Sequence, residues 1–362
     1  MHERYVTPDR PDATSLVPQL ASLATAVPDH RYEQGEIFRT LIPRGFTPVQ
    51  QRLARRVFHS SGVAYRHTVI DLSEPIEAMS TAARNDRYVL EAVDLGERAA
   101  RAALDGAGVA PEGIDELVFV SSSGIDLPSL DLRLAARLGL RPDVRRLSVL
   151  GMGCNAAVPG LVRAYQSAQS PPGRNVLTVA LEISSLHYQV SEALENVVVS
   201  ALFADGAAAS VISPHLTPGP ILVDTATQCD YRGFDYITSH LTDRGFQGSM
   251  TVEVPEAIEA AVGPFVDGLL GRNGLTRDQV AHWCLHPGGP KILECVRRAL
   301  DLEERDLEHS YAVLRNFGNM SSPTVLFVLH RIQALRAPRS GEIGVLVAFG
   351  PGLTLDGLLM RW

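Results

Sequence analysis

The feature that most constrains this fold is an α/β segment that occurs twice, in the same order and with the same spacing. Ser121 and His286 each close an apolar strand, and Cys154 and Asn319 each begin an apolar helix. Both pairs are separated by 165 residues (286 − 121 and 319 − 154). The helices and the strands that follow them are 156–168 with 175–181, and 322–335 with 342–349. The pattern predicts an internal duplication of one α/β unit whose strands are buried on both faces.

A duplication also predicts where a functional site would form. Equivalent strand ends and helix starts in two related halves can face one another across a pseudo-twofold axis. We therefore expect residues 1–212 and 213–362 to form the two halves. We also expect Cys154, His286 and Asn319 to lie together, although they are far apart in the sequence.

Local patterns predict several further elements. A short apolar strand is expected around 20–27, and the arginine-rich stretch 31–70 is expected to be helical. Apolar residues at helical spacing predict a helix over 84–104 that ends at Gly106, and a second helix over 258–270. Short apolar strands are expected at 117–120 and 281–286.

The composition excludes several classes of protein. The 362 residues carry a formal net charge of −8 and are 45% hydrophobic, which suits a large core and argues against a general nucleic-acid binder. The first 20 residues form no apolar signal segment, and no run approaches the roughly 18 apolar residues of a membrane span. The four cysteines form no Cys-x-x-Cys pair and no metal-ligand spacing. We expect a soluble, cytoplasmic protein with free thiols and no metal, membrane or nucleic-acid partner.

Cys154 is the candidate nucleophile. Glycines crowd the positions before it and small residues follow, as suits a tight turn that leads into a helix. At a helix N-terminus the dipole and the free N–H groups lower the pKa of a thiol from its usual value of about 8.5 and favour the nucleophilic thiolate. A buried structural cysteine is the alternative, and it is our interpretation of Cys229, Cys284 and Cys295.

His286 and Asn319 are the candidate partners of this thiol. His286 ends an apolar strand before Pro-Gly-Gly, where the glycines let a ligand approach the backbone, although a lone histidine is more often structural. Asn319 either caps a helix or donates a hydrogen bond to an oxyanion. A thiol, an imidazole and an amide together suit a decarboxylative Claisen condensation, in which an acyl-cysteine is attacked by the enolate formed from a malonyl thioester. That reaction needs neither a metal nor a redox cofactor.

Five motifs carry a family resemblance over most of the chain, from about residue 20 to 362. They are SGIDLP (123–128), ALFADGAA (201–208), WCLHPGGP (283–290), GNMSS (318–322) and FGPGLT (349–354). In this order they resemble the type III polyketide synthases, the chalcone synthase-like branch of the thiolase superfamily. Asn155, directly after the nucleophile, is similar to the bacterial dihydroxyphenylacetyl-CoA synthase-like branch.

The resemblance implies a five-layered αβαβα thiolase-like fold built from two duplicated halves, and a homodimer in the cytoplasm. It implies that Cys154 is the nucleophile, and that His286 and Asn319 support decarboxylation and stabilise the oxyanion. Phe203 would stand as an aromatic gate between the carrier tunnel and the cavity, and Leu127 would reach into the cavity of a partner subunit. The positions that it implies for the cavity wall are Ser122, His187, Ser321, Gly350, Pro351 and Gly352.

The sequence departs from the plant pattern at two places. Gly248 stands where plant members carry a second gatekeeper phenylalanine, which would open one wall to a bulkier or longer acyl group. Of the basic residues that hold coenzyme A phosphates in plant members, Arg56 matches, with Arg55 beside it and Lys291 at the tunnel mouth. Weak clamping of coenzyme A leaves an acyl carrier protein as an alternative donor beside acyl-CoA and malonyl-CoA.

Four other functions share part of this pattern. A ketoacyl-acyl carrier protein synthase III uses the same three residue types, but follows its histidine with Gln-Ala-Asn rather than Pro-Gly-Gly. A papain-like cysteine hydrolase has its cysteine near the mature N-terminus, in Cys-Gly-x-Cys-Trp. A catalytically dead thiolase-fold scaffold would lack one of the three residues. A ketosynthase that joins two carrier-bound β-keto chains into a pyrone keeps the fold and changes the reaction.

Overall fold

One mixed sheet of nine strands runs through the residues described by the computed structural model (17–42, 46–189, 194–216 and 219–362). Its first part consists, in spatial order, of β5 (Arg145–Leu150), β4 (Glu116–Ser121), β6 (Val176–Ile183), β7 (Asp205–Ser213) and β1 (Gln19–Ala26). Its second part consists of β8 (Ile221–Cys229), β13 (Thr354–Arg361), β12 (Ile343–Gly350) and β11 (Val280–Leu285). The parts meet where β1 pairs with β8, in the register Gln19↔Ile221.

The two parts repeat one pairing pattern. In the first part β4 and β6 are parallel, and β6–β7 and β7–β1 are antiparallel. In the second part β11 and β12 are parallel, and β12–β13 and β13–β8 are antiparallel. The sheet order therefore confirms the duplication that the 165-residue offset predicts.

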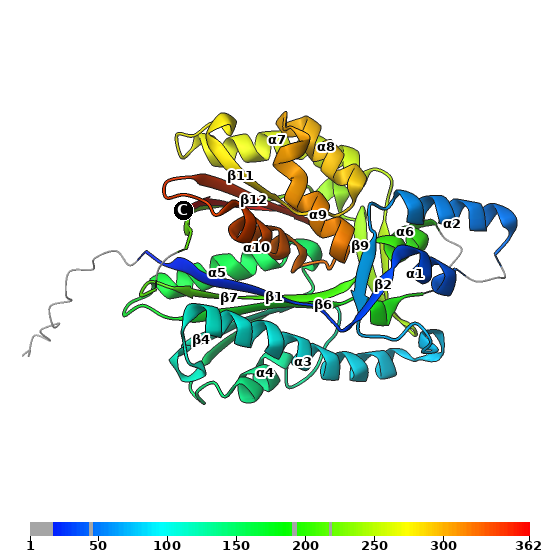
Figure 1. The fold of residues 1–362 in the computed structure, drawn as a ribbon, viewed down its shortest axis with the longest axis horizontal. Helices are drawn as coiled ribbons and strands as arrows, with labels where there is room; N and C mark the ends of the chain where they lie inside the picture. The colour runs from blue at the N-terminus through cyan, green and yellow to red at the C-terminus, as the bar shows by residue number, and fades with distance from the viewer. Residues whose placement is uncertain (1–16, 43–45, 190–193, 217–218) are drawn as a thin grey trace, which may run out of the picture.

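The helices complete five alternating layers, which Figure 1 shows nearly edge-on. The outer layer below the first part contains α3 (Thr81–Ala107) and α4 (Leu130–Leu138). The middle layer contains α5 (Ala157–Gln169) and α10 (Thr324–Arg336), one from each half. The outer layer above the second part contains α7 (Val254–Gly271) and α8 (Pro290–Leu300), with α9 (Glu308–Phe317) in front. This arrangement is the αβαβα fold that the resemblance implies.

Three hydrophobic clusters hold the layers together. One joins α3 and α4 to the first part of the sheet, and another joins α7 and α8 to the second part. The third lies between the two parts and is filled by α5 and α10. Because α10 is covered on both sides, its residues from Thr324 to Leu329 are all buried, with no polar face. Both middle helices are therefore fixed at their starts, where Cys154 and Asn319 lie.

The remaining elements gather at one end of the molecule, at the right of Figure 1. They are β2 (His30–Glu33), α1 (Gln34–Leu41), α2 (Pro48–Ser60), β3 (Tyr65–Thr68), α6 (Leu194–Leu202), β9 (Ile237–Thr242) and β10 (Gly245–Met250). The strands β9 and β10 form an antiparallel hairpin. This end of the fold covers the candidate site.

Two sequence expectations were wrong in detail. The stretch 31–70 is not helical throughout, because β2 and β3 pair with one another over four residues each. Neither strand has an alternating apolar pattern, so only their contact in the folded chain reveals them. The helix expected to stop at Gly106 continues to Ala107 and is capped by Gly108, which has a left-handed φ of 65°.

No described helix is both long enough and apolar enough to cross a membrane. No group of three or more His, Cys, Asp or Glu side chains in the same residues is arranged to hold a metal ion.

Candidate active site

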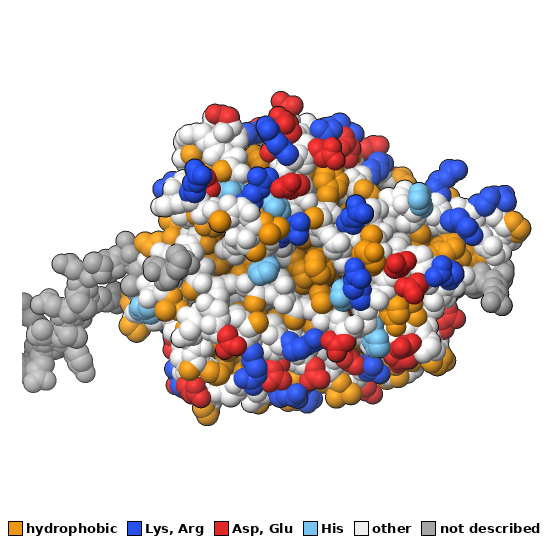
Figure 2. All heavy atoms as spheres, in the orientation of Figure 1, with side chains coloured by type: hydrophobic (Ala, Val, Ile, Leu, Met, Phe, Trp, Pro, Cys, Tyr) orange, Lys and Arg blue, Asp and Glu red, His pale blue; other side chains and the backbone are white. Residues whose placement is uncertain are grey.

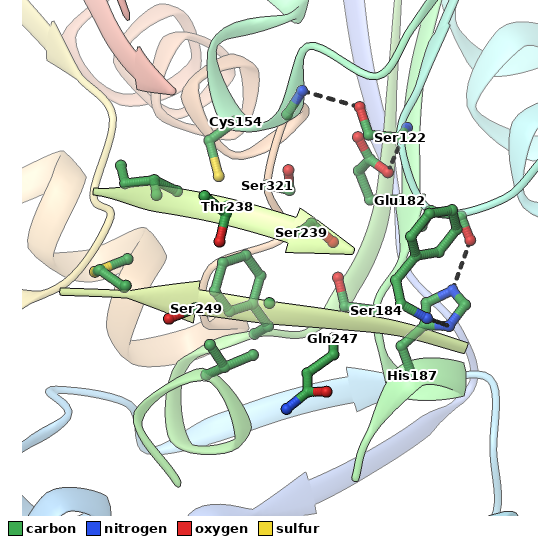
Figure 3. Close-up of a pocket in the computed structure, with 18 of the residues that line it drawn as sticks. Ser122, Cys154, Glu182, Ser184, His187, Thr238, Ser239, Gln247, Ser249 and Ser321 are labelled. Carbon is green, nitrogen blue, oxygen red and sulfur yellow. Dashed lines mark hydrogen bonds between the residues drawn. The ribbon is translucent and has the colours of Figure 1, made fainter. Parts of the chain in front are cut away.

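A cavity of about 150 Å³ lies between the sheet and the β9–β10 hairpin, with Cys154 on its wall. Figure 3 shows the sulfur of Cys154 pointing toward the hairpin, with Ser321 beside it. Polar side chains on the surrounding walls are Ser122, Glu182, Ser184, Thr238, Ser239, Gln247 and Ser249. The apolar wall is formed by Val199, Phe203, Ile237, Phe246, Met250 and Pro351.

Cys154 is presented by a tight turn between β5 and α5. Gly153 has a left-handed φ of 76°, and its N–H donates to Ser122 Oγ at 3.0 Å. A Cβ on Gly153 would lie 2.6 Å from Cδ of Pro351, so a larger residue fits neither the backbone conformation nor the space. A short 3₁₀ turn, Gly153–Asn155, then leads into α5. The glycine before Cys154 is therefore required by the turn, as the sequence indicates.

The pKa of Cys154 is raised, whereas the sequence predicts that it is lowered. The pKa of its thiol is raised to about 11, chiefly by burial, and the nearby Glu182 carboxylate acts in the same direction. Hydrogen bonds from Ser321 and Asn319 favour the thiolate, but they offset only part of the burial term. The lowering that the sequence predicts is not found, because taking the thiolate out of water costs more than these hydrogen bonds return.

The backbone of Asn319 joins the C-terminal half to the N-terminal half. Its N–H donates to Leu202 O at 2.8 Å, and its own carbonyl accepts from Ala204 N at 2.9 Å. These two bonds place Phe203 and Asn319 side by side as an isolated parallel bridge. The aromatic residue on the cavity wall and the candidate catalytic amide are therefore held in one fixed arrangement.

The side-chain amide of Asn319 has one defined orientation. Its Oδ1 accepts from Ser321 N at 2.8 Å and from Thr324 Oγ1 at 3.3 Å. The NH₂ group must therefore point the other way, where it lies 3.4 Å from Gly288 O and hydrogen-bonds with Cys154. The side chain of Asn319 does not cap α10, whose N-cap is Pro323, and its donor group faces Gly288 and Cys154.

His286 follows β11 and is only 1% exposed. Its backbone N–H donates to Val347 O at 2.9 Å, while its carbonyl accepts from Gly288 N at 3.0 Å. The same Gly288 contacts the Asn319 amide, so the two residues are linked through one glycine. Neither ring nitrogen has a partner among the described residues, and burial lowers the pKa of the ring to about 3. The ring is therefore uncharged and has no protein partner in the described part of the chain, and neither His286 nor Asn319 is among the residues that line the cavity of Cys154.

Glu182 is a buried acid at this site that the sequence analysis missed. Its carboxylate accepts from Ser122 N at 2.9 Å and from Ser322 Oγ at 2.9 Å, and burial raises its pKa to about 7. It lines the cavity and acts on Cys154 through its charge. The signal was present, because Glu182 is the single charged residue in the otherwise apolar strand β6.

Comparisons with known proteins agree over nearly the whole chain. Residues 19–215 match the family described as chalcone and stilbene synthases, N-terminal domain, and residues 226–362 match its C-terminal domain. The chain belongs to the chalcone and stilbene synthase family. It is a type III polyketide synthase, a condensing acyltransferase that catalyses decarboxylative Claisen condensation.

Relatives of this polyketide synthase come from bacteria, plants and algae. It is 34% identical to 1,3,6,8-tetrahydroxynaphthalene synthase of Streptomyces peucetius subsp. caesius, over 100% of this chain and 96% of that protein. It is 33% identical to type III polyketide synthase 21 of Oryza sativa subsp. japonica, over 94% and 93%. The crystal structure of PKS-I from the brown alga Ectocarpus siliculosus has a TM-score of 0.91, with 30% identity, and covers 97% and 100% of the two chains.

The expected wall residues of the synthase fall into two groups. Those that line the cavity are Ser122, His187, Phe203, Gly248, Ser321 and Pro351. Gly350 and Gly352 lie outside it. A Cβ on Gly350 would fall 1.6 Å from Asn155 Oδ1, so this glycine makes room for Asn155 instead. Leu127 is 93% exposed and points away from the cavity of its own chain.

The three residues expected to hold the carrier lie on the surface of the synthase. Arg55 and Arg56 are exposed on α2, and Lys291 is exposed at the start of α8. The guanidinium of Arg55 lies over the ring of Phe38, 5.5 Å from its centroid. None of the three lines the cavity that holds Cys154.

His187 lines the cavity of the synthase, but both of its ring nitrogens bind the protein. Nε2 lies 2.6 Å from Ser123 O, so it carries the proton, and Nδ1 accepts from Phe246 N at 3.2 Å. Burial lowers the pKa of this ring to about 4. His187 therefore ties the loop after β4 to the β9–β10 hairpin and offers the cavity mainly ring carbons.

Proposed function

We propose that Cys154 carries the growing acyl chain, and that His286 and Asn319 bind the oxygen on which negative charge develops. The observation that carries this assignment is that Cys154 lines the cavity and hydrogen-bonds with Asn319, whose amide is oriented by Ser321 N. A donor that is oriented before substrate arrives costs no reorganisation when charge develops.

Loading is the first step of the proposed reaction. The thiol of Cys154 loses its proton, and its sulfur attacks the carbonyl of an acyl-CoA. The bond between that carbonyl and coenzyme A breaks, and the coenzyme A sulfur takes up a proton. A base must accept the proton of the thiol, and His286 is proposed for this role because neither ring nitrogen has a partner in the described part of the chain.

Condensation is the second step. The bond between the carboxylate carbon and the α-carbon of malonyl-CoA breaks, carbon dioxide leaves, and the electron pair remains as an enolate. The His286 ring and the Asn319 NH₂ group donate to the enolate oxygen. The α-carbon then attacks the acyl-cysteine, and Cys154 leaves as the thiolate. The burial of this site matters because water would protonate the enolate. The electrons come from the carbon–carbon bond, so no cofactor is needed.

The expected substrates are acyl-CoA and malonyl-CoA, held at their phosphates by Arg55, Arg56 and Lys291. Incubation with ¹⁴C-carboxyl malonyl-CoA and a panel of acyl-CoA starters tests this proposal. We expect labelled carbon dioxide, and an acyl mass on the wild-type protein that is absent from Cys154→Ala. Consumption of carrier-bound β-keto chains without labelled carbon dioxide would instead support the pyrone-forming ketosynthase.

We further propose that Gly248 opens the hairpin wall of the cavity to larger acyl groups. A Cβ at this position would lie 3.6 Å from Val199 Cγ2, an ordinary contact, so a side chain can enter the space. Gly248→Phe should lower kcat/KM for a decanoyl starter about tenfold and leave an acetyl starter within twofold, because only the longer chain needs that space. Gly268→Ala, on the exposed side of α7 with no atom within 4 Å of its added Cβ, is the control. Equal losses for both starters would contradict the proposal.

A homodimer formed through the edge of the first half-sheet fits the surface of the chain. β5 is the last strand on that side of the sheet and pairs only with β4 among the described strands. Exposed apolar residues beside this edge are Ile125, Leu127, Leu150 and Met152. We propose that a second copy covers them and that Leu127 enters its cavity. Leu127→Glu should shift the mass measured by light scattering from dimer to monomer, and an unchanged dimer would contradict this interface.

A further inference from the structure

The outer surface of α2 carries cations that no acidic side chain neutralises. Arg52, Arg55, Arg56 and His59 are exposed, and in the described part of the chain none of them forms an ion pair. Elsewhere arginines are commonly paired with carboxylates, as Arg87, Arg101, Arg137, Arg297 and Arg298 are. In a protein of net charge −8, a helix of unpaired cations marks a surface for an anionic partner. Figure 2 shows several basic side chains at the end of the molecule where α1 and α2 lie.

The same helix also exposes apolar side chains, which form a row beside the rows of its cations. Val49 and Leu53 are 64% and 44% exposed, and they stand four residues apart. Arg52 with Arg56, and Arg55 with His59, have the same spacing, so three rows run along the helix surface. At about 1.5 Å per residue, the rows extend over about 15 Å. The phosphates of one nucleotide would use only part of these cations, and they would gain nothing from Val49 and Leu53. The mixture instead suits an acidic, amphipathic helix of a protein.

The α2 surface connects directly to the wall of the cavity. Ser61 follows the last residue of α2, and the Gln34 side chain bonds both Ser61 Oγ at 2.9 Å and Ala201 O at 2.7 Å. Ala201 stands two residues before Phe203, which lines the cavity with Cys154. The helix that carries the cations is therefore linked through Gln34 to α6, which ends one residue before Phe203.

We propose that the α2 surface docks an acidic acyl carrier protein, which delivers its acyl chain to Cys154. The inference rests on the proposed role of Cys154 as the acyl-carrying nucleophile. In the transfer, the thioester bond to the carrier's phosphopantetheine sulfur breaks and a bond from the acyl carbon to Cys154 Sγ forms. The proton lost by Cys154 ends on the released pantetheine thiol, so the exchange needs no further reactant.

The test compares two donors of the same acyl group. The full-length protein is mixed with hexanoyl-CoA, or with an acidic bacterial acyl carrier protein that carries hexanoyl-phosphopantetheine. The rate of Cys154 acylation is followed by intact-protein mass spectrometry. The variants are Arg52→Glu and Val49→Asp, neither of which changes a residue assigned to coenzyme A. Arg339→Glu is the matched control, because Arg339 is an exposed cation without an ion pair on the loop after α10.

We expect Arg52→Glu to slow transfer from the carrier protein about tenfold, and to leave transfer from hexanoyl-CoA within twofold. Transfer from the carrier should also slow as salt is raised, while Arg339→Glu behaves as wild type. Equal losses for both donors would assign α2 to the phosphates alone and overturn the docking proposal, as would an unchanged rate from the carrier. Absence of Cys154 acylation by either donor in wild type would overturn the proposed function itself.

Discussion

The two halves of this synthase share a left-handed glycine before a middle helix, but different side chains follow that glycine. Gly153 and Gly318 have φ angles of 76° and 74°, and each precedes the residue at the start of a middle helix. In the N-terminal half that residue is Cys154, on the wall of the cavity. In the C-terminal half it is Asn319, which is 1% exposed and held at both ends of its amide.

The residues that follow the neighbouring strands also differ between the halves, because one side chain binds the turn and the other has no protein partner. In the N-terminal half Ser122, just after β4, supports the turn by accepting from Gly153 N. In the C-terminal half His286, just after β11, leaves both ring nitrogens without a protein partner. In the proposed mechanism, the N-terminal half therefore provides the nucleophile and the C-terminal half provides the groups that bind the substrate oxygen. The duplication places Cys154 and Asn319 at equivalent turns, and the side chains around the two turns differ.

The strongest test of this comparison removes the nucleophile. Cys154→Ala should lower polyketide formation by about 10⁴-fold or more, because the acyl-enzyme cannot form. Product formation is measured by chromatography after incubation with malonyl-CoA and an acyl-CoA starter. Cys229→Ala, which removes an exposed thiol, is the control and should retain wild-type activity. Substantial activity in Cys154→Ala would refute the assignment of the two turns.

The next test removes the fixed donors of the C-terminal half. Asn319→Ala and His286→Ala should each lower kcat for condensation about 100- to 1000-fold, because one oxyanion donor is lost. Ser122→Ala in the N-terminal half should cost far less, since it removes one hydrogen bond of about 1 kcal/mol. Single-turnover measurements separate acylation of Cys154 from condensation. Equal losses for Ser122→Ala and Asn319→Ala would show that the halves do not divide the work in this way.

A smaller effect is expected from the paired glycines. Alanine at Gly153 or Gly318 must adopt a left-handed φ, at a cost of about 1–2 kcal/mol. It would also contact Pro351 Cδ at 2.6 Å or Leu202 O at 2.9 Å. Gly139→Ala is the matched control, since Gly139 has a φ of 79° and its Cβ would meet no atom within 4 Å. Both site variants should lower Tm more than the control does in thermal unfolding. A loss no greater than that of Gly139→Ala would remove the steric part of the argument.

The smallest expected change concerns the pH dependence of Cys154. The Glu182 carboxylate raises the pKa of this thiol, so Glu182→Gln should lower that pKa. The rise of iodoacetamide alkylation with pH should therefore occur at lower pH in the variant, because the thiolate forms earlier. Peptide mass spectrometry distinguishes Cys154 from the exposed Cys229. Glu342→Gln, at an acid beside His282, is the control, and a profile identical to wild type in Glu182→Gln would contradict the assigned charge effect.

The sequence by itself determined the order of the fold and the residues most suited to the chemistry. Apolar periodicity located the strands and helices, because core-facing residues must recur with the period of the backbone. The common offset aligned Cys154 with Asn319. The glycine before each of them signalled a turn that other residues do not readily adopt. The five motifs then identified the family, as the comparisons confirm.

The tertiary structure decided the electrostatics and the orientation of these groups. The pKa of Cys154 is raised because burial and Glu182, far away in the sequence, outweigh a helix dipole that is visible locally. The Asn319 amide is oriented by Ser321 and Thr324, and the His286 ring is neutral because the closed layers exclude water. Burial of a side chain and contacts between distant residues arise only when the layers pack. A local pattern in the sequence therefore cannot predict the pKa shifts and orientations that they cause.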